Sequence, residues 1–139
     1  MTLPDQITDA NVATTKRIYA AVPAGDLEGV LALLDPEIRI EYLGTDVIPY
    51  AGDFHGIDGA TEFFTRVGTA AEVVSVDPRL FITEGDHVAV WGHIVLRARH
   101  SGREWGSDFA HIITLRDGRW LHLRDFANSA EAAEVFAAA

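Results

Sequence analysis

The sequence predicts an α+β fold in which helices pack on one face of a curved antiparallel sheet. Segments with helical periodicity dominate the first half of the chain, whereas long segments of alternating polar and apolar residues dominate the second half. The last two alternating segments flank Asp117-Gly118, and an Asp-Gly pair in this setting is a strong β-hairpin signal. A strongly bent sheet with helices across its mouth would enclose an apolar cavity, so a ligand is expected there.

The first predicted helix covers residues 7–22, where apolar side chains recur at helical spacing. Thr8 or Asp9 can cap its first turn, and Pro23 and Gly25 end it.

Two more helices are predicted in this half of the chain. Asp26 caps a short helix over residues 27–34, which ends before an Asp-Pro pair because proline disfavours helical backbone in the residue before it. Asp58 caps a third helix that extends to about residue 67.

Alternation predicts the strands. Residues 37–43 form the first strand, with Ile38, Ile40 and Tyr42 on one face, and residues 44–56 form a loop at the rim of the cavity. The later predicted elements are strands over 73–83, 87–99, 103–116 and 120–126 and a final helix over 129–136. A proline in the middle of the first of these strands, Pro78, indicates a bulge or a sheet edge.

Length and composition limit the possible functions. The 139 residues have the size of one domain, residues 1–139, and 48% of them are apolar, enough for a sizeable core. The net charge of −10 argues against nucleic acid and against an anionic membrane surface as partners. Cysteine is absent, which excludes disulfides and cysteine-based zinc sites. Neither a transmembrane segment nor a signal peptide is recognisable, so a cytoplasmic location is expected.

Each apolar face of the predicted hairpin is interrupted by one ionisable group. The faces carry Phe109, His111, Ile113 and Leu115 in the first arm and Leu121, Leu123 and Asp125 in the second. A carboxylate among leucines is costly unless it is paired, so we predict a contact between His111 and Asp125, direct or through one water. A two-residue turn alone would put Ala110 opposite Asp125, whereas a longer loop or a bulge restores His111.

Both groups have structural alternatives to a role in function. Asp125 lies near the end of its strand, where it could form a salt bridge or cap the turn into the last helix, and His111 could be a core histidine bonded to a backbone carbonyl. As functional residues, Asp125 is a candidate general acid or base and His111 is its partner. His122 alternates with Trp120, so both are expected on the outer face.

Aromatic residues near the hairpin and in the 44–56 loop are the candidate substrate contacts. Tyr42 could donate a hydrogen bond to a substrate oxygen, or it could be a half-buried aromatic residue whose hydroxyl meets water. Trp105 shares a face with His111 and is either a pocket wall or a core residue. The expected substrate-binding residues are Trp105, Phe109, Tyr50, His55, Phe64 and Leu123. A metal site is not expected, because the histidines show no ligand spacing with carboxylates.

Three segments resemble the SnoaL-like branch of the NTF2-like superfamily. They are residues 24–42 (AGDLEGVLALLDPEIRIEY), 48–64 (IPYAGDFHGIDGATEFF) and 109–126 (FAHIITLRDGRWLHLRDF). The resemblance covers nearly the whole chain. It implies a cone-shaped α+β fold around a deep apolar pocket and a homodimer formed through the outer face of the sheet.

At the site, the hairpin most resembles the SnoaL-type polyketide cyclases, which are related to ketosteroid isomerases. Those enzymes resemble this chain in placing an acid–base residue eight positions after the turn Asp, which is Asp125 here. A second polar group six positions before the turn Asp is His111 here. The resemblance implies proton transfer at a carbon α to a carbonyl, with no metal or organic cofactor.

Two related groups match less well. Compared with ketosteroid isomerases, Ile18 stands at the position of the first-helix Tyr, with Tyr19 next to it, and Tyr42 replaces the general-base Asp. His111 replaces the protonated Asp, so steroid isomerisation is not expected. The Arg-x-Asp pair of epoxide hydrolases is missing from the long strand, where residues 94–96 are apolar.

The leading functional hypothesis is a cofactor-independent acid–base enzyme that cyclises, isomerises or dehydrates a small apolar carbonyl compound. Asp125 would transfer the proton, His111 would orient it or donate to an oxyanion, and Tyr42 would be a further donor. One alternative is a non-catalytic domain that binds a small molecule or mediates dimerisation. Another is an epoxide hydrolase in which Asp125 activates water. The expected partners are a small apolar ligand and a second copy of the chain, not nucleic acid or a membrane.

Overall fold

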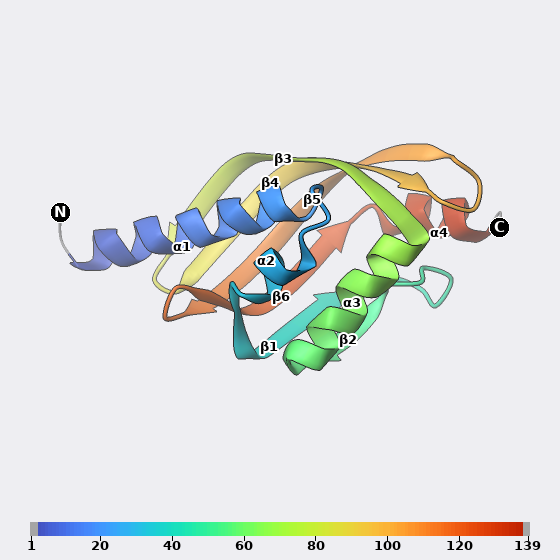
Figure 1. The fold of residues 1–139 in the computed structure, drawn as a ribbon. Helices are drawn as coiled ribbons and strands as arrows, with labels where there is room; N and C mark the ends of the chain where they lie inside the picture. Colours follow the sequence, from blue (N-terminus) through green and yellow to red (C-terminus); the bar gives the residue numbers. More distant parts are fainter. Residues whose placement is uncertain (1–2, 138–139) are drawn as a thin grey trace.

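The computed structural model describes residues 3–137 as helices packed against a six-stranded sheet (Figure 1). The elements in order are α1 (Leu3–Ala21), α2 (Leu27–Leu31), β1 (Leu34–Tyr42), β2 (Gly52–His55), α3 (Gly56–Ala70), β3 (Ala71–Glu84), β4 (His87–Ala98), β5 (Glu104–Arg116), β6 (Arg119–Ala127) and α4 (Ser129–Ala137). The strand order is β2-β1-β6-β5-β4-β3. The predicted α+β fold is therefore confirmed. No helix within residues 3–137 combines the length and the apolar character needed to cross a membrane.

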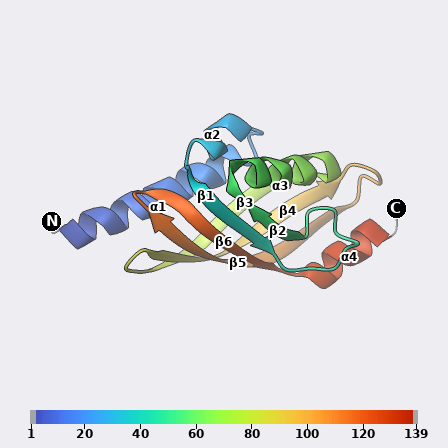
Figure 2. The same cartoon turned by 90° about the horizontal axis from the view of Figure 1, so that it is seen from below.

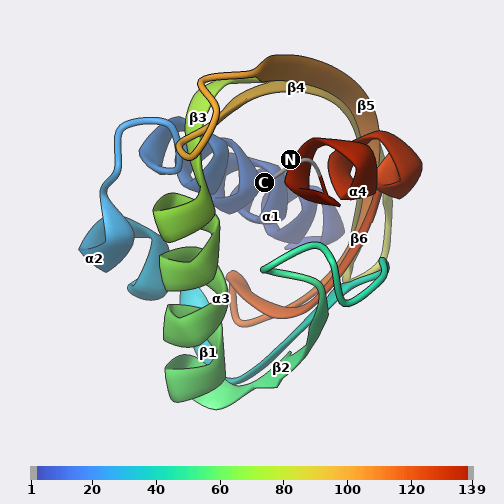
Figure 3. The same cartoon turned by 90° about the vertical axis from the view of Figure 1, so that its right-hand side faces the viewer.

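The sheet curves around one side, where the helices pack. Viewed end-on, its strands curl around α1 and α3, while α4 lies across one end (Figure 3). The view from below shows α2 and α3 on the same side of the sheet (Figure 2). The concave face forms the core because alternate strand residues point into it, as Ile38, Ile40 and Ile113 do with less than 1% of their surface exposed.

One pair of strands departs from the antiparallel sheet that the sequence predicts. β1 and β6 pair in parallel, whereas the other neighbours in the sheet are antiparallel. The reason is topological, since the chain passes through β2, α3 and three long strands before β6 returns beside β1.

The helices begin and end at other residues than the sequence pattern predicts. α1 begins at Leu3, so Thr8 and Asp9 lie inside it rather than capping it, and Pro4 lies in the first turn, where a missing N–H is tolerated. α2 ends at Leu31, although its predicted cap is correct, because the side chain of Asp26 accepts a hydrogen bond from the backbone N–H of Gly29.

The segment after α2 becomes a strand earlier than predicted. β1 includes Asp35 and Pro36, and its register against β6 shifts between Leu34 and Arg39. The buried carboxylate of Asp35 is bound by the guanidinium of Arg116, with Nη2–Oδ1 and Nε–Oδ2 distances of 2.8 and 3.0 Å. This ion pair holds the start of β1 to the end of β5.

The predicted 44–56 loop contains the short strand β2, which pairs with β1. α3 then begins at Gly56 rather than at Asp58. Gly56 has a φ of +73°, a left-handed backbone that glycine adopts at little cost, and this allows the chain to turn from β2 directly into the helix. The helix also continues to Ala70, beyond the predicted end at residue 67.

The predictions for the long strands agree closely with the structure. β3 is an edge strand of the sheet, and its register against β4 shifts between Pro78 and Leu80, so the proline marks both an edge and an irregularity. β4 and β5 differ from their predicted bounds by one residue at one end.

The β5–β6 hairpin turns at the predicted Asp117-Gly118 pair, and both residues have positive φ. Leu115 pairs with Trp120, but Thr114 pairs with His122, so Leu121 is an extra residue in β6. This bulge brings His111 opposite Asp125. It also turns Trp120 into the core with 1% exposure, which corrects the prediction that Trp120 lies on the outer face.

Candidate functional site

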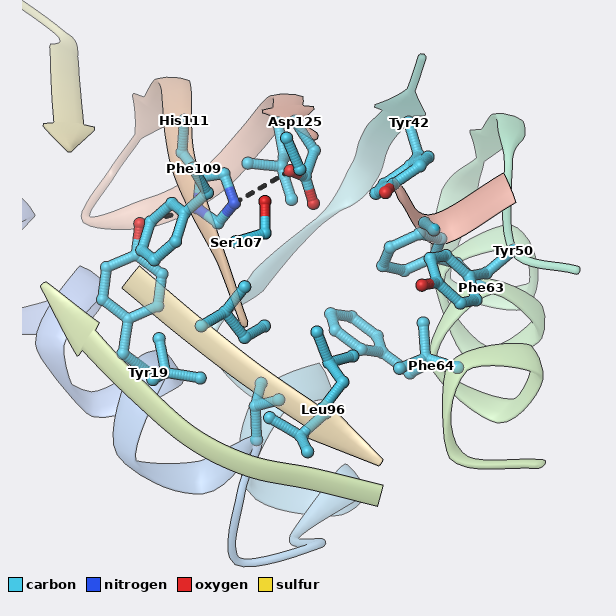
Figure 4. Close-up of a pocket in the computed structure, with 18 of the residues that line it drawn as sticks. Tyr19, Tyr42, Tyr50, Phe63, Phe64, Leu96, Ser107, Phe109, His111 and Asp125 are labelled. Atoms are coloured by element: carbon cyan, nitrogen blue, oxygen red, sulfur yellow. Dashed lines mark hydrogen bonds and ion pairs between the residues drawn. The ribbon is translucent and has the colours of Figure 1, made fainter. Parts of the chain in front are cut away.

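A cavity of about 100 Å³ lies between the concave face of the sheet and the helices α1 and α3 (Figure 4). For comparison, a buried apolar cavity of ~150 Å³ binds benzene. Most of the wall is aliphatic or aromatic. In the described chain, His111 and Asp125 are the lining residues that carry an imidazole or a carboxylate, and no lysine or arginine lines the cavity. The site therefore suits a small neutral ligand with one or two polar atoms.

The structure brings almost all the predicted site residues to this cavity. Its lining includes Tyr42, Tyr50, Phe64, Trp105, Phe109, His111, Leu123 and Asp125. His55 is the exception, with 67% of its side chain exposed and its Nε2 3.2 Å from Oδ1 of Asp53. The reason is alternation in β2, where Phe54 points inward and its neighbours on both sides point outward.

The predicted contact between His111 and Asp125 is present. Nε2 of His111 lies 3.1 Å from Oδ1 of Asp125, and the two side chains are 12% and 15% exposed. They are register partners on β5 and β6, so the bulge at Leu121 places both on the same face of the sheet. Figure 4 shows both side chains directed into the cavity.

Tyr19 is a site residue that the sequence analysis did not select. It lies on α1, is 5% exposed, and its hydroxyl is 2.8 Å from Nδ1 of His111. The resemblance to ketosteroid isomerases placed Ile18 at the relevant position, and Ile18 instead lies in the core beside the cavity. The available signal was a tyrosine on the apolar face of a helix, where a buried hydroxyl needs a partner.

Tyr42 and Tyr50 lie on the other side of Asp125 from His111. Tyr42 is the register partner of Asp125 across β1 and β6, and its ring packs edge-on against that of Tyr50 at a centroid distance of 5.1 Å. Both hydroxyls point toward the cavity in Figure 4. Burial raises the pKa of Tyr42, and the charge of Asp125 raises it further. Burial likewise raises the pKa of Tyr50, so both phenols remain protonated hydrogen-bond donors.

This arrangement places a carboxylate acceptor between neutral donors inside an apolar enclosure. Such a group can accept a proton from a bound molecule, and the phenols can donate hydrogen bonds to an oxygen atom nearby. Within residues 3–137, His, Asp and Glu side chains do not gather in a group of three or more that could hold a metal ion.

The segment that lacks the Arg-x-Asp pair of epoxide hydrolases contributes to the cavity wall. Ile94 and Leu96 on β4 line the cavity with apolar side chains. In the described chain, Asp125 is the carboxylate that lines this cavity, and no arginine lines the cavity beside it.

Comparison with known proteins identifies a family and a set of similar folds. The family model of the SnoaL-like domain matches residues 15–123. No curated protein sequence matches the chain. An NTF2-like protein of unknown function from Burkholderia pseudomallei has 28% identity and a TM-score of 0.81 over 91% of this chain and 97% of its own.

Two further structures are informative. TerC, crystallised with polyporic acid, has 26% identity and a TM-score of 0.81 over 92% of this chain and 98% of its own. A candidate SnoaL-like polyketide cyclase from Jannaschia sp. CCS1 has 19% identity and a TM-score of 0.79 over 94% of both chains, which supports the fold alone.

Proposed function

This chain belongs to the SnoaL-like domain family, within the NTF2-like superfamily, and we propose that it is a cofactor-independent acid–base enzyme. Its substrate is a small, neutral, apolar carbonyl compound. The observation that carries the proposal is the pairing of His111 with Asp125 inside an apolar cavity at 3.1 Å. A histidine–carboxylate pair in such a place is costly for folding, and proton transfer gives a reason for it.

In the proposed reaction, Asp125 removes a proton from the carbon α to the substrate carbonyl. The C–H electron pair moves to form an enolate, whose oxygen accepts a hydrogen bond from the protonated phenol of Tyr42. His111 holds the carboxylate in place by donating to Oδ1. In isomerisation, the proton on Asp125 then returns to another carbon of the same molecule. In aldol cyclisation, the enolate carbon bonds to a second carbonyl carbon of the substrate, and the proton goes to the alkoxide that forms. In dehydration, the C–O bond β to the carbonyl breaks, and the proton leaves with the hydroxyl as water.

The walls of the cavity support the proposed substrate class. Phe64, Trp105, Phe109 and Leu123 surround the polar groups with apolar surface, which excludes water and strengthens the few hydrogen bonds that remain. A lining without lysine or arginine in the described chain disfavours an anionic substrate. The structural similarity to TerC, crystallised with polyporic acid, supports a small-molecule ligand in this fold.

The proposal can be tested without knowing the natural substrate. Small ketones such as cyclohexanone and acetophenone would be incubated with the protein in D₂O, and NMR would follow loss of the α-proton signal. The wild type should accelerate exchange, and Asp125→Asn should not. If no ketone of a broad panel exchanges faster with the wild type than with Asp125→Asn, the acid–base proposal is wrong.

A non-catalytic binding domain is the second candidate function. The mainly apolar cavity favours it as well, because ligand binding needs no proton transfer. Binding of a neutral aromatic ligand that is equal in the wild type and Asp125→Asn, with no exchange by either, would support this candidate. Epoxide hydrolysis is a weaker candidate, and solvent ¹⁸O in a diol product would identify it.

We also propose that the chain forms a homodimer through the outer face of the sheet. One cross-strand row over β3, β4, β5 and β6 contains Leu80, Trp91, Ala110 and Phe126. Leu80, Trp91 and Phe126 are 49%, 45% and 41% exposed, and the exposed Ile82 and Ile112 extend the row into a patch. Patches of this kind commonly mark protein–protein contacts. Light scattering should give a dimer mass for the wild type and a monomer mass for Trp91→Arg; a monomeric wild type would contradict the proposal.

A further inference from the structure

The hydroxyl of Tyr19 forms a 2.8 Å hydrogen bond with Nδ1 of His111. The residue comes from α1, far from β5 in the sequence, and two other contacts hold this helix to the hairpin. Nε1 of Trp120 donates to the hydroxyl of Thr15 at 3.1 Å, and the hydroxyl of Thr14 donates to the backbone carbonyl of Gly118 at 2.6 Å. Tyr19 lies one turn beyond these anchors, so its position above His111 is fixed.

The location of the proton in this contact follows from the surroundings of the phenol. Burial raises the pKa of Tyr19, and the negative charge of Asp125 raises it further. The phenol therefore keeps its proton at neutral pH. A protonated phenol next to a ring nitrogen donates to it, provided that the nitrogen carries a lone pair.

We infer that Tyr19 is a positioning residue that fixes the tautomer of His111. With Nδ1 accepting from Tyr19, a neutral imidazole carries its proton on Nε2 and donates it to Oδ1 of Asp125, 3.1 Å away. The three groups form a chain in which each hydrogen bond sets the direction of the next. This inference rests on the proposed function only for its effect on catalysis.

This chain of hydrogen bonds gives His111 and Asp125 different roles. Both nitrogens of His111 are occupied, one by Tyr19 and one by Asp125, so the imidazole orients the carboxylate and does not meet the substrate proton. Asp125 has a second carboxylate oxygen, and that atom receives the proton in the proposed reaction.

Loss of the Tyr19 hydroxyl should therefore allow His111 to adopt both neutral tautomers, without altering the cavity wall. Tyr19→Phe keeps the ring, which packs edge-on against Phe109 and Trp120 at centroid distances of 5.9 and 6.0 Å. It removes the hydroxyl that donates to Nδ1. Partners that orient metal-binding histidines contribute about ten- to hundredfold to activity, and by analogy we expect a loss of that size in the exchange rate with little change in KM.

The test is ¹⁵N NMR of the histidine side chains, with His111→Gln used to assign the signal of His111. The wild type should show a protonated Nε2 and an unprotonated Nδ1 for His111, and Tyr19→Phe should show a mixture of tautomers. His122 is the internal control, because its Nε2 contacts Glu41 on the outer face and should not respond. A wild-type His111 with its neutral proton on Nδ1, or an unchanged tautomer in Tyr19→Phe, would overturn the inference.

The tautomer measurement needs no substrate, so its outcome is independent of catalysis. If the tautomers behave as expected but no ketone exchanges, the proposed function fails and the role of Tyr19 in orienting His111 stands. If exchange requires Asp125 but Tyr19→Phe keeps both the tautomer and the rate, the proposed function stands and the role of Tyr19 is wrong.

Discussion

Two histidine–carboxylate pairs lie side by side in the sheet, one on each face. His111 and Asp125 pair across β5 and β6 on the concave face, with a nitrogen–oxygen distance of 3.1 Å. On the outer face, Nε2 of His122 on β6 lies 3.0 Å from Oε2 of Glu41 on β1, diagonally across the two strands. The histidines are similarly buried, with side chains that are 12% and 15% exposed. Neither distance nor burial of the histidine distinguishes the two pairs.

The difference lies in what surrounds each carboxylate. Glu41 is next to two guanidiniums, since Nη2 of Arg39 lies 2.6 Å from Oε1 and Nε of Arg124 lies 3.9 Å from Oε2. Asp125 faces an apolar cavity. In the described chain, the phenols of tyrosines and the imidazole of His111 line this cavity with it. A carboxylate whose charge is balanced by nearby guanidiniums is typical of a structural surface network. A carboxylate in an enclosed space without such a neighbouring charge is typical of a functional site. The outer pair is therefore a control for the inner one.

The largest expected effect comes from removing the charge of each carboxylate in turn. Asp125→Asn should reduce ketone α-proton exchange by about one-hundred- to ten-thousandfold, the usual contribution of a general base. Glu41→Gln removes a carboxylate at the same distance from a histidine and should leave the exchange rate unchanged. Deuterium exchange followed by NMR measures both. Equal losses in the two variants would remove the functional distinction between the faces.

Replacing each histidine should again slow exchange only at the inner pair, by a smaller factor. His111→Phe retains a flat ring beside Phe109 but removes the donor to Asp125. A hydrogen bond to a charged group contributes about 1.5–3 kcal/mol, so exchange should slow by about ten- to hundredfold. His122→Phe is the matched variant and should keep the wild-type rate. A rate that falls only in His122→Phe would contradict the assignment of the inner pair.

Tyr42→Phe tests the proposed donor to the enolate oxygen. Losing one hydrogen bond to a developing oxyanion should slow exchange by at least about tenfold. Because burial raises the pKa of Tyr42, its phenol stays protonated, and the wild-type rate should show no alkaline decline from this group. Steady-state rates across alkaline pH measure both effects. An unchanged rate in Tyr42→Phe would exclude the tyrosine from the reaction.

Asp35 is a purely structural carboxylate, and its removal should change stability alone. Hydrogen bonds from Arg116 and from the backbone N–H of Glu37 hold the pKa of Asp35 below its usual value. Because the pKa is lowered on folding, this group stabilises the protein above its unfolded-state pKa and loses that contribution as pH falls through the folded-state pKa. Asp35→Asn should cost about 1 kcal/mol at neutral pH, a modest value because Arg116 is half exposed.

Denaturant unfolding at several pH values measures this effect. The stability difference between the wild type and Asp35→Asn should shrink below about pH 4. Exchange activity should be the same in both proteins. A difference that grows in acid would show that the ion pair with Arg116 does not hold the strands together as described.

Local sequence patterns predicted most of the fold and most of the inner site. The Asp117-Gly118 turn predicted the hairpin, and the two ionisable groups on its apolar faces predicted a contact between His111 and Asp125, provided that a longer loop or a bulge sets the register; the structure has the hairpin, a bulge and the contact. Alternation in β1 likewise predicted that Tyr42 points inward, and it is 7% exposed. These features depend on neighbouring residues, which a sequence shows directly.

The features that escaped prediction depend on residues distant in the sequence. The bulge at Leu121, which decides the hairpin register and turns Trp120 inward, has no glycine or proline to mark it. His55 was expected at the rim, but the pairing of β2 with β1 directs it outward. The contact of Tyr19 with His111 spans 92 residues and arises from the packing of α1 on the sheet.

The most direct test of the central claim is a crystal structure of the wild type soaked with cyclohexanone, a ketone with a single ring. The ring should occupy the cavity, with its oxygen in hydrogen-bond reach of the Tyr42 hydroxyl. An α-carbon should then lie about 3–3.5 Å from a carboxylate oxygen of Asp125, the distance of a reactive contact. A ketone that binds inside the cavity with its carbonyl turned away from both residues, or that binds on the outer face beside Glu41, would contradict it.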